Sequence, residues 1–369
     1  MTGQQICNRC VMDKTAHSIV FDAAGICNFC TEFLTQQHDG RRRATNSKEQ
    51  RFVQLVNAIK QAGRGKKYDC IVGISGGVDS SYALHLAVSH GLRPLAVHMD
   101  NGWDSELAQH NIANLVKKLN VGLYTHVIDW QEYKGLMQAF FAADVIDVEL
   151  LYDNAMIALN YQMAAKYDLR YILSGCNRAT EGIRIPANWN TFKLDKKNIQ
   201  ALAKRGHVQI KTFPSIGLMG YLYARLIKKI QWIFTLDYID YNKQACVDFL
   251  HQHYDFKPYP YKHYESVFTR FYQAYILPQK FGVDKRKVHF SSLIMSGQMD
   301  RTEALQSLEE SPYPSRQDLA ADKTYFLKKM QWNQAALDHY LKRPMIHHAV
   351  YGSEYPLAKG LEKIWKLLR

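Results

Sequence analysis

Seven residues near position 80 combine two glycines with hydroxyl and carboxylate side chains. Residues 75–81, Ser-Gly-Gly-Val-Asp-Ser-Ser, follow a short apolar segment and open a predicted helix. The glycines let the backbone approach a ligand closely and point successive N–H groups inward. The start of the helix adds partial positive charge that favours a phosphate. Ser75, Ser80 and Ser81 offer hydroxyl donors, and Asp79 is a ligand for Mg²⁺. We therefore predict a phosphate site here, with a plain glycine turn capped by Ser or Asp as the alternative.

Four cysteines near the N-terminus form two short pairs. Cys7 and Cys10 are separated by two residues, as are Cys27 and Cys30, with sixteen residues between the pairs. This spacing is typical of zinc sites in which four thiolates close a tetrahedron and leave no open position. We predict a structural Zn²⁺ that folds a small knuckle too short to bury a core of its own. A redox disulfide pair or an iron site is the alternative.

The next segments alternate between short strands and helices. Strands are predicted over 69–74, 94–99, 123–128 and 170–173, and helices over 80–90, 105–120, 130–143 and 153–167. This alternation predicts an α/β fold with a doubly wound parallel sheet. Ligands of such sheets bind beyond the carboxyl ends of the strands. Three parts of the chain are expected: a zinc knuckle and connector (1–45), an α/β domain (46–190) and a mainly helical region for substrate or partner (191–369).

Helices in the last part are predicted over 219–234, 242–253, 264–277 and 302–308. The first of these places apolar side chains beside Arg225, Lys228 and Lys229. Such a helix either lies on a membrane surface or packs against the protein body. We favour packing.

Composition and charge narrow the possible classes of protein. The chain has 369 residues, of which 47% are hydrophobic and 22% charged, and this composition excludes global disorder. No apolar run is long enough to span a bilayer and no signal segment opens the chain, so we expect a cytoplasmic protein without a membrane span. The net charge of +13 is unevenly placed: residues 71–190 hold 8 basic and 12 acidic residues, whereas residues 191–300 hold 17 and 8. A basic coat for nucleic acid, a solvated surface and a pocket for an anionic ligand all fit this surplus.

The glycine loop resembles the signature of the N-type ATP pyrophosphatases, or PP-loop ATPases. The resemblance implies cleavage of ATP between the α and β phosphates, with the loop holding the departing pyrophosphate. It implies that Glu181 completes a Mg²⁺ shell with Asp79, and that Cys176 stands where relatives often carry histidine. The ATP-binding residues it implies are Ser75, Gly76, Gly77, Val78, Asp79, Ser80, Ser81, His98, Met99, Asp100 and Gly175.

Three blocks together resemble the N-acetyl sugar amidotransferases of bacterial surface-polysaccharide biosynthesis, the WbpG-like proteins. The blocks are the cysteine segment 7–30, the loop 75–81, and the segment that contains Lys-His-Tyr-Glu-Ser (262–266) and Lys-Phe-Gly-Val-Asp-Lys-Arg-Lys (280–287). The resemblance implies conversion of a sugar acetamido group to an acetamidino group, with ATP and Mg²⁺ as cofactors. Catalytic candidates are Asp79, Glu181, Lys262 and Lys285, and substrate-binding candidates are Asn177, Arg184, His263, Arg286 and Lys287.

The resemblance also implies partners. A separate glutaminase and a barrel-type synthase subunit would supply ammonia, because no cysteine here sits in a Gly-x-Cys-x-Gly nucleophile elbow. The substrate would be a sugar or nucleotide sugar, and no nucleic acid is expected. Two alternatives stay open. One is a tRNA-modifying thiolase with Cys176 as sulfur carrier, and the other is an inactive nucleotide-binding scaffold.

Overall fold

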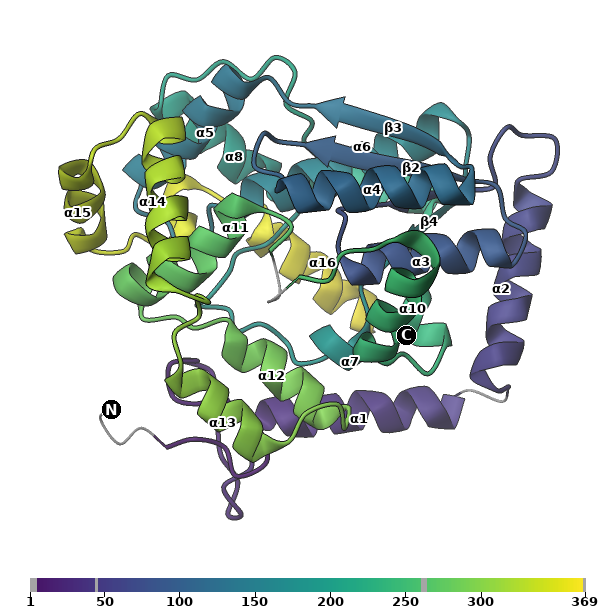
Figure 1. The fold of residues 1–369 in the computed structure, drawn as a ribbon, viewed down its shortest axis with the longest axis horizontal. Coiled ribbons are helices and arrows are strands. Elements are labelled where there is room, and N and C mark those ends of the chain that lie inside the picture. The colour runs from purple at the N-terminus through teal and green to yellow at the C-terminus, as the bar shows by residue number, and fades with distance from the viewer. Residues whose placement is uncertain (1–4, 44–45, 260–263, 368–369) are drawn as a thin grey trace.

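A five-stranded parallel sheet forms the centre of the protein (Figure 1). The computed structural model describes residues 5–43, 46–259 and 264–367. The strand order is β3-β2-β1-β4-β5, and Ile71 of β1 lies between Leu95 of β2 and Ile172 of β4. The predicted α/β fold is confirmed. The strands are β1 (Cys70–Gly73), β2 (Pro94–Asp100), β3 (Gly122–Val127), β4 (Tyr171–Ser174) and β5 (Gln231–Phe234).

Helices cover both faces of this sheet because consecutive strand residues point to opposite sides. Ile71 packs into the core formed with α5 and α6, whereas Val72 packs into the core formed with α2, α3, α4 and α10. The sheet is therefore doubly wound, as the sequence predicts. The helices of the two layers are α2 (Lys48–Ala62), α3 (Val78–Ser89), α4 (Glu106–Leu119), α5 (Trp130–Ala142), α6 (Leu150–Lys166), α8 (Lys196–Arg205) and α10 (Lys243–Tyr254).

The chain reverses its direction across the sheet between β1 and β4. From β1 it proceeds through β2 to β3 on one side, and then it returns to add β4 and β5 on the other side. The loops that leave β1 and β4 therefore diverge, and they leave a crevice at the carboxyl edge of the sheet.

Two glycines allow these loops to pack closely. A Cβ on Gly175 would lie 2.4 Å from the carbonyl carbon of Asp79. Gly76 adopts a φ of +80°, and a Cβ there would lie 2.7 Å from the carbonyl oxygen of Ala108. The loop after β4 thus rests directly on the backbone at the start of α3.

The predicted helix over 219–234 is wrong at its C-terminal end. The structure has α9 (Leu218–Leu222), a π-helical turn η1 (Tyr223–Ile227) and then β5, which pairs with β4. Lys229 adopts a left-handed φ of 56° and ends the helix. The aromatic and β-branched residues that follow pack as a strand, with Trp232 against the Tyr161 ring.

The rest of the described C-terminal region is mainly helical, as predicted.

The N-terminal knuckle, coloured purple in Figure 1, lies beside helices α12 and α13. Residues 41–43, which belong to the expected connector, form the end of helix α1 (Asn28–Arg43). No helix among the described residues is long and apolar enough to cross a bilayer. The predicted domain boundaries stay predictions, although β5 joins residues beyond 190 to the sheet. The remaining elements are α7 (Arg178–Glu181), η2 (Thr235–Tyr238), α11 (Val267–Phe271), η3 (Tyr272–Phe281), α12 (Arg286–Met295), α13 (Arg301–Glu309), α14 (Arg316–Met330), α15 (Gln334–Lys342), η4 (His348–Tyr351) and α16 (Tyr355–Leu367).

We predict that Gly175→Ala destabilises the protein by about 1–3 kcal/mol, because the new methyl group meets backbone atoms that cannot move aside. Gly360→Ala is the matched control, because a Cβ there meets nothing within 4 Å. Alanine at this helical position should be neutral or should stabilise the helix by up to about 1 kcal/mol. Urea unfolding of both variants measures the difference, and equal stabilities would contradict the proposed loop contact.

Candidate functional site

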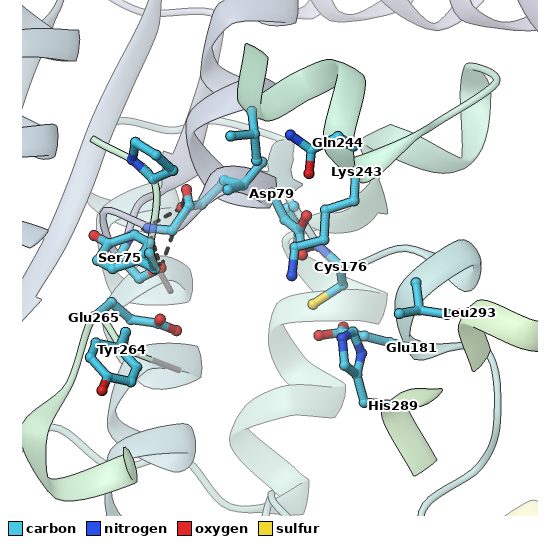
Figure 2. Close-up of a pocket in the computed structure, with 18 of the residues that line it drawn as sticks. Ser75, Asp79, Cys176, Glu181, Lys243, Gln244, Tyr264, Glu265, His289 and Leu293 are labelled. Carbon is cyan, nitrogen blue, oxygen red and sulfur yellow. Dashed lines mark hydrogen bonds between the residues drawn. The ribbon is translucent and has the colours of Figure 1, made fainter. Parts of the chain in front are cut away.

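A cavity of about 820 Å³ opens at the crevice between β1 and β4 (Figure 2). The loops after β1 and β4 form one wall, and α10 forms another. The third wall is the C-terminal segment from Tyr264 to Pro312. The cavity therefore joins the sheet to the part of the chain where the sequence shows its basic and aromatic cluster. Its polar lining includes Ser75, Asp79, Ser80, Cys176, Glu181, Lys243, Glu265, Lys285, Arg286 and His289.

The glycine loop is internally hydrogen-bonded before any ligand binds. The backbone N–H of Ser75 donates to Ser80 Oγ at 3.2 Å, and the two hydroxyl oxygens lie 3.3 Å apart. The N–H of Gly77 donates to Ser75 Oγ at 3.4 Å. Of the residues predicted to bind ATP, Ser75, Gly77, Val78, Asp79, Ser80 and Gly175 line the cavity. Gly76 and Ser81 are buried and lie outside the cavity lining.

Asp79 has a partner that the sequence analysis missed. The hydroxyl of Tyr241 donates to Asp79 Oδ1. Burial and the charge of Asp79 raise the pKa of Tyr241, so the phenol stays protonated as the donor. Lys243, at the start of α10, extends toward Asp79 and Cys176 in Figure 2. Both residues lie over 160 positions after the loop, and no local motif marks them.

Cys176, Glu181 and His289 lie together on the side of the cavity that faces Tyr264 and Glu265 (Figure 2). Cys176 is exposed, whereas Cys70 and Cys246 are buried as predicted. His289 Nδ1 lies 3.1 Å from the carbonyl oxygen of Thr180, so this nitrogen carries the proton and donates. The ring therefore has a fixed orientation at the cavity wall.

The three residues at the end of β2 that the sequence predicts to bind ATP do not line the cavity. His98 is buried, and its Nε2 lies 2.9 Å from Asp104 Oδ2 while its Nδ1 lies 3.1 Å from the carbonyl oxygen of Ile74. Burial lowers the pKa of His98, but the hydrogen bond and charge of Asp104 outweigh burial and leave the pKa raised. Met99 is buried, and Asp100 lies outside the cavity lining. His98 thus ties the end of β1 to the loop after β2.

That loop in turn holds a cavity residue. The N–H of Ser105 donates to the carbonyl oxygen of Glu265 at 2.9 Å, and the N–H of Val267 donates to that of Trp103 at 2.9 Å. Glu265 lines the cavity opposite the glycine loop, where a Cβ on Gly77 would lie 4.0 Å from the Glu265 carboxyl carbon.

The basic cluster within residues 264–289, the part of this segment that the structure describes, is largely paired inside the protein. Lys285 Nζ lies 2.6 Å from Glu149 Oε2, and Arg286 pairs with Asp284 at 2.8 Å. Lys287 pairs with Asp13 of the knuckle at 2.5 Å. Two further ion pairs join Arg270 to Asp322 at 2.5 Å and Lys280 to Asp144 at 2.9 Å. Much of the positive surplus therefore neutralises carboxylates of the same chain.

The structure brings only some of the predicted catalytic and substrate-binding residues to the cavity. Asp79, Glu181, Lys285 and Arg286 line it. Three others lie elsewhere. Lys287 binds the knuckle, Arg184 pairs with Glu32 at 3.0 Å, and Asn177 is a buried cap whose Oδ1 accepts the Thr180 N–H at 2.9 Å. Lys262 and His263 lie outside the described residues.

A buried charged network lies behind the Lys285–Glu149 pair. Lys193 Nζ lies 2.7 Å from Asp147 Oδ2 and 2.8 Å from Asp153 Oδ2. Burial opposes ionisation of Asp147, but the charges of Lys193 and Lys285 hold its pKa below the ordinary value. His348 Nε2 accepts the backbone N–H of Asp147 at 3.1 Å, and its Nδ1 donates to Asn198 Oδ1 at 2.8 Å. The imidazole is therefore neutral.

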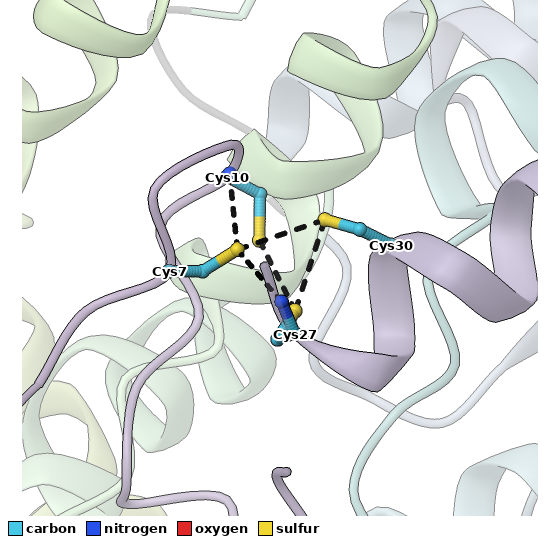
Figure 3. A group of neighbouring side chains, drawn as sticks. All are labelled: Cys7, Cys10, Cys27 and Cys30. Carbon is cyan, nitrogen blue, oxygen red and sulfur yellow. Dashed lines mark hydrogen bonds between the residues drawn. The ribbon is translucent and has the colours of Figure 1, made fainter. Parts of the chain in front are cut away.

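The four predicted metal ligands form one buried cluster (Figure 3). All four Sγ atoms lie within 4.8 Å of one another, and three separations are 3.7–3.9 Å. A zinc tetrahedron with Zn–S bonds near 2.3 Å has edges of about 3.8 Å. The backbone N–H of Cys27 donates to Cys7 Sγ at 3.2 Å, which stabilises a thiolate. The donor set and its spacing fit Zn²⁺.

The sheet, the crevice and the glycine loop define an open α/β protein with a ligand cavity at the switch point of its sheet. Residues 265–366 match the model of the LPS biosynthesis protein WbpG-like, C-terminal domain. This part of the chain is thus similar to a WbpG-like C-terminal domain, and it supplies much of the third cavity wall. No curated protein matches the chain.

Several solved structures resemble the fold. NMN synthetase from Francisella tularensis is 16% identical, covers 58% of this chain and 99% of its own, and gives a TM-score of 0.30. NH3-dependent NAD synthetase from Campylobacter jejuni is 18% identical. The match covers 44% of this chain and 74% of the synthetase, with a TM-score of 0.29. A predicted subunit of tRNA methyltransferase from Methanocaldococcus jannaschii is 18% identical. The match covers 43% of this chain and 75% of that subunit, with a TM-score of 0.24. All three TM-scores lie below 0.5, so the fold assignment rests on the sheet order and loops described above.

We predict that Cys27→Ser loses stoichiometric zinc and much of its solubility, because three thiolates leave the knuckle without a closed site. Cys176→Ser, which removes an exposed thiol outside the cluster, should keep the metal. Elemental analysis of both purified proteins measures the zinc content. Full zinc in Cys27→Ser would argue against a four-cysteine site.

We predict that the protein loses about 2 kcal/mol of stability between pH 7 and pH 5 through His348. Burial lowers the pKa of His348 to about 4, so the unfolded chain binds a proton first as the pH falls. The stabilisation that His348 contributes is present above pH 6.5. It is lost as the pH falls toward the pKa of His348 in the folded protein. In His348→Gln this loss should disappear, whereas exposed His38→Gln should keep it. Denaturant unfolding at pH 7 and pH 5 measures how much the free energy of unfolding changes. An equal change in all three proteins would contradict the assignment of this loss to His348.

Proposed function

We propose that this protein is an ATP-dependent amidotransferase that converts the acetamido group of a sugar to an acetamidino group. One observation carries the proposal: the glycine loop and the WbpG-like C-terminal domain face each other across the same cavity. A volume of about 820 Å³ has room for a nucleotide and a sugar together. We also propose that the sugar belongs to bacterial surface-polysaccharide biosynthesis, such as the O-antigen of lipopolysaccharide.

The chemistry requires activation of a poor electrophile. An amide oxygen is a very poor leaving group, so transfer of AMP from ATP to this oxygen, with release of pyrophosphate, would make it displaceable. Ammonia then adds to the carbon, a proton is lost, and the C–O bond breaks with departure of AMP. Loop N–H groups at the start of α3 would stabilise charge on the departing pyrophosphate.

Asp79 and Glu181 are the residues that would hold Mg²⁺. Both carboxylates border the cavity, and oxygen ligands are those that Mg²⁺ prefers. The ion, when bound, neutralises phosphate charge. Tyr241 orients the Asp79 carboxylate, and the ion pair with Glu149 holds the Lys285 ammonium at the wall.

Ammonia would come from a separate glutaminase that works with a barrel-type synthase subunit. This part of the proposal rests on the sequence resemblance and stays a prediction. It is tested by whether free ammonium alone supports the reaction, and by whether glutamine does so only after such subunits are added.

A tRNA-modifying thiolase is the second candidate, and exposed Cys176 at the cavity is the observation that favours it. Persulfide transfer commonly uses a second reactive cysteine. Cys70 and Cys246 are buried, and burial raises the pKa of Cys246 to about 12, which disfavours its reactive thiolate. The internal pairing of the basic cluster also leaves less positive charge for tRNA. Amidotransfer is therefore the better supported function.

The deciding experiment incubates a diacetamido nucleotide sugar with the protein, ATP, Mg²⁺ and ammonium. Mass spectrometry should show the small loss of mass that accompanies replacement of a carbonyl oxygen by NH, and AMP and pyrophosphate should accumulate. ATP consumption that requires tRNA, with the sugar unchanged, would overturn the proposal in favour of tRNA modification.

We predict that Asp79→Asn lowers pyrophosphate release at least 100-fold, because a neutral amide stabilises neither Mg²⁺ nor the developing charge well. Tyr241→Phe should show a smaller loss, since the carboxylate remains but is less well oriented. Asp248→Asn is the matched control, because this exposed carboxylate borders the same cavity and bonds only Gln244 among the partners shown. A coupled pyrophosphate assay measures all three. Unchanged turnover in Asp79→Asn would remove this residue from the proposed site.

A further inference from the structure

The segment α9–η1 exposes a row of large apolar side chains. Met219, Tyr223, Leu226 and Ile227 are 66, 54, 58 and 65% exposed. Their spacing of four, seven and eight residues places them along one side of the helical segment. The packing role favoured from the sequence is therefore wrong for these four side chains, which are more than half exposed, whereas Ile230 of the same predicted helix is buried.

Basic side chains surround this row without any acidic neighbour in the sequence. Residues 218–230 contain Arg225, Lys228 and Lys229 and no Asp or Glu. All three basic residues are exposed. We call Met219, Tyr223, Arg225, Leu226, Ile227, Lys228 and Lys229 the apolar–basic face.

A second helix with exposed apolar and basic side chains, α16, starts at the same point of the fold, and it also carries the exposed Glu362. In α16, Leu357, Leu361 and Ile364 are 52, 38 and 54% exposed at spacings of four and seven residues. Lys359 and Lys363 are exposed on the same helix. Glu354, which directly precedes α16, accepts the backbone N–H of Leu218 at 3.3 Å, so α9 and α16 begin side by side.

We propose that the apolar–basic face, together with α16, binds the surface of an anionic membrane. Apolar side chains of an interfacial helix enter the boundary between headgroups and acyl chains, and lysine and arginine contact acidic headgroups. A protein partner fits less well, because the buried parts of protein interfaces are depleted in lysine. The face is separate from the cavity residues, so the proposal does not depend on amidotransfer.

The test is sedimentation of the full-length protein with vesicles of phosphatidylcholine that contain 30% phosphatidylglycerol. Binding should be clear at low salt, weak with pure phosphatidylcholine, and strongly reduced in 0.5 M NaCl. Lys228→Ser with Lys229→Ser should weaken binding about 30-fold. Leu226→Ser with Ile227→Ser should weaken it at least tenfold, because the inserted apolar area is lost.

Matched controls separate this face from general surface effects. Val53→Ser with Val127→Ser removes exposed apolar side chains elsewhere, and Lys117→Ser with Lys204→Ser removes basic ones. Both should bind vesicles like the unmodified protein. Because every substituted residue is exposed, circular dichroism should show unchanged folding in all variants.

Two results would overturn the proposal. One is vesicle binding that is absent, or is unaffected by the substitutions in the apolar–basic face. The other is a dimer in lipid-free solution, seen by light scattering, that the Leu226→Ser, Ile227→Ser variant abolishes, since it would assign the face to a second copy of the chain.

Discussion

The contact between Gly175 and the backbone at Asp79 is the constraint on which the cavity depends. It joins the first residues of the loop after β4 to the start of α3, at the point between β1 and β4 where the strand order reverses. Any side chain at position 175 would separate them. The close approach fixes the distance between Asp79 and the residues after β4, Cys176 and Glu181, within one wall of the cavity. The geometry of the site is therefore set by backbone packing before any polar side chain contributes.

Several basic residues of this protein form ion pairs inside the chain. The segment with the strongest positive surplus supplies Lys280, Lys285 and Lys287, each of which pairs with a carboxylate from the first 150 residues. Removing one partner of such a pair leaves a buried charge without compensation, which costs far more than an exposed pair contributes. These pairs thus fix the C-terminal region against the sheet and the knuckle. The net charge alone pointed toward nucleic acid, and its placement removes most of that argument.

Local patterns predicted what is local in this fold. The sequence predicted the alternation of strands and helices, the glycine loop and the four-cysteine cluster, because each depends on residues that are close together in the chain. Two kinds of feature were not predicted. Tyr241 reaches Asp79 from 162 positions away, and no pattern around it marks that contact. β5 was mistaken for the end of a helix, because pairing with β4 decides its conformation and the sequence shows only a short apolar run. The family resemblance implied that Arg184 and Lys287 bind the substrate, but their partners are carboxylates of the N-terminal segment.

The four-cysteine knuckle is connected to the cavity through hydrogen bonds with α12 and α13. Arg301 at the start of α13 donates to the carbonyl oxygens of Cys7 and Cys10, at 2.8 Å and 3.1 Å, and the N–H of Val11 donates to Ser291 Oγ at 3.3 Å. Ser291 lies on α12, the helix that presents His289 to the cavity. A knuckle this small has little core of its own, so a metal bound by the four cysteines would supply the rigidity that lets these bonds hold α12 in place. Loss of the metal should therefore displace α12 in the cavity wall as well as unfold the N-terminal knuckle. The four-cysteine site would then affect ligand binding without contacting the ligand.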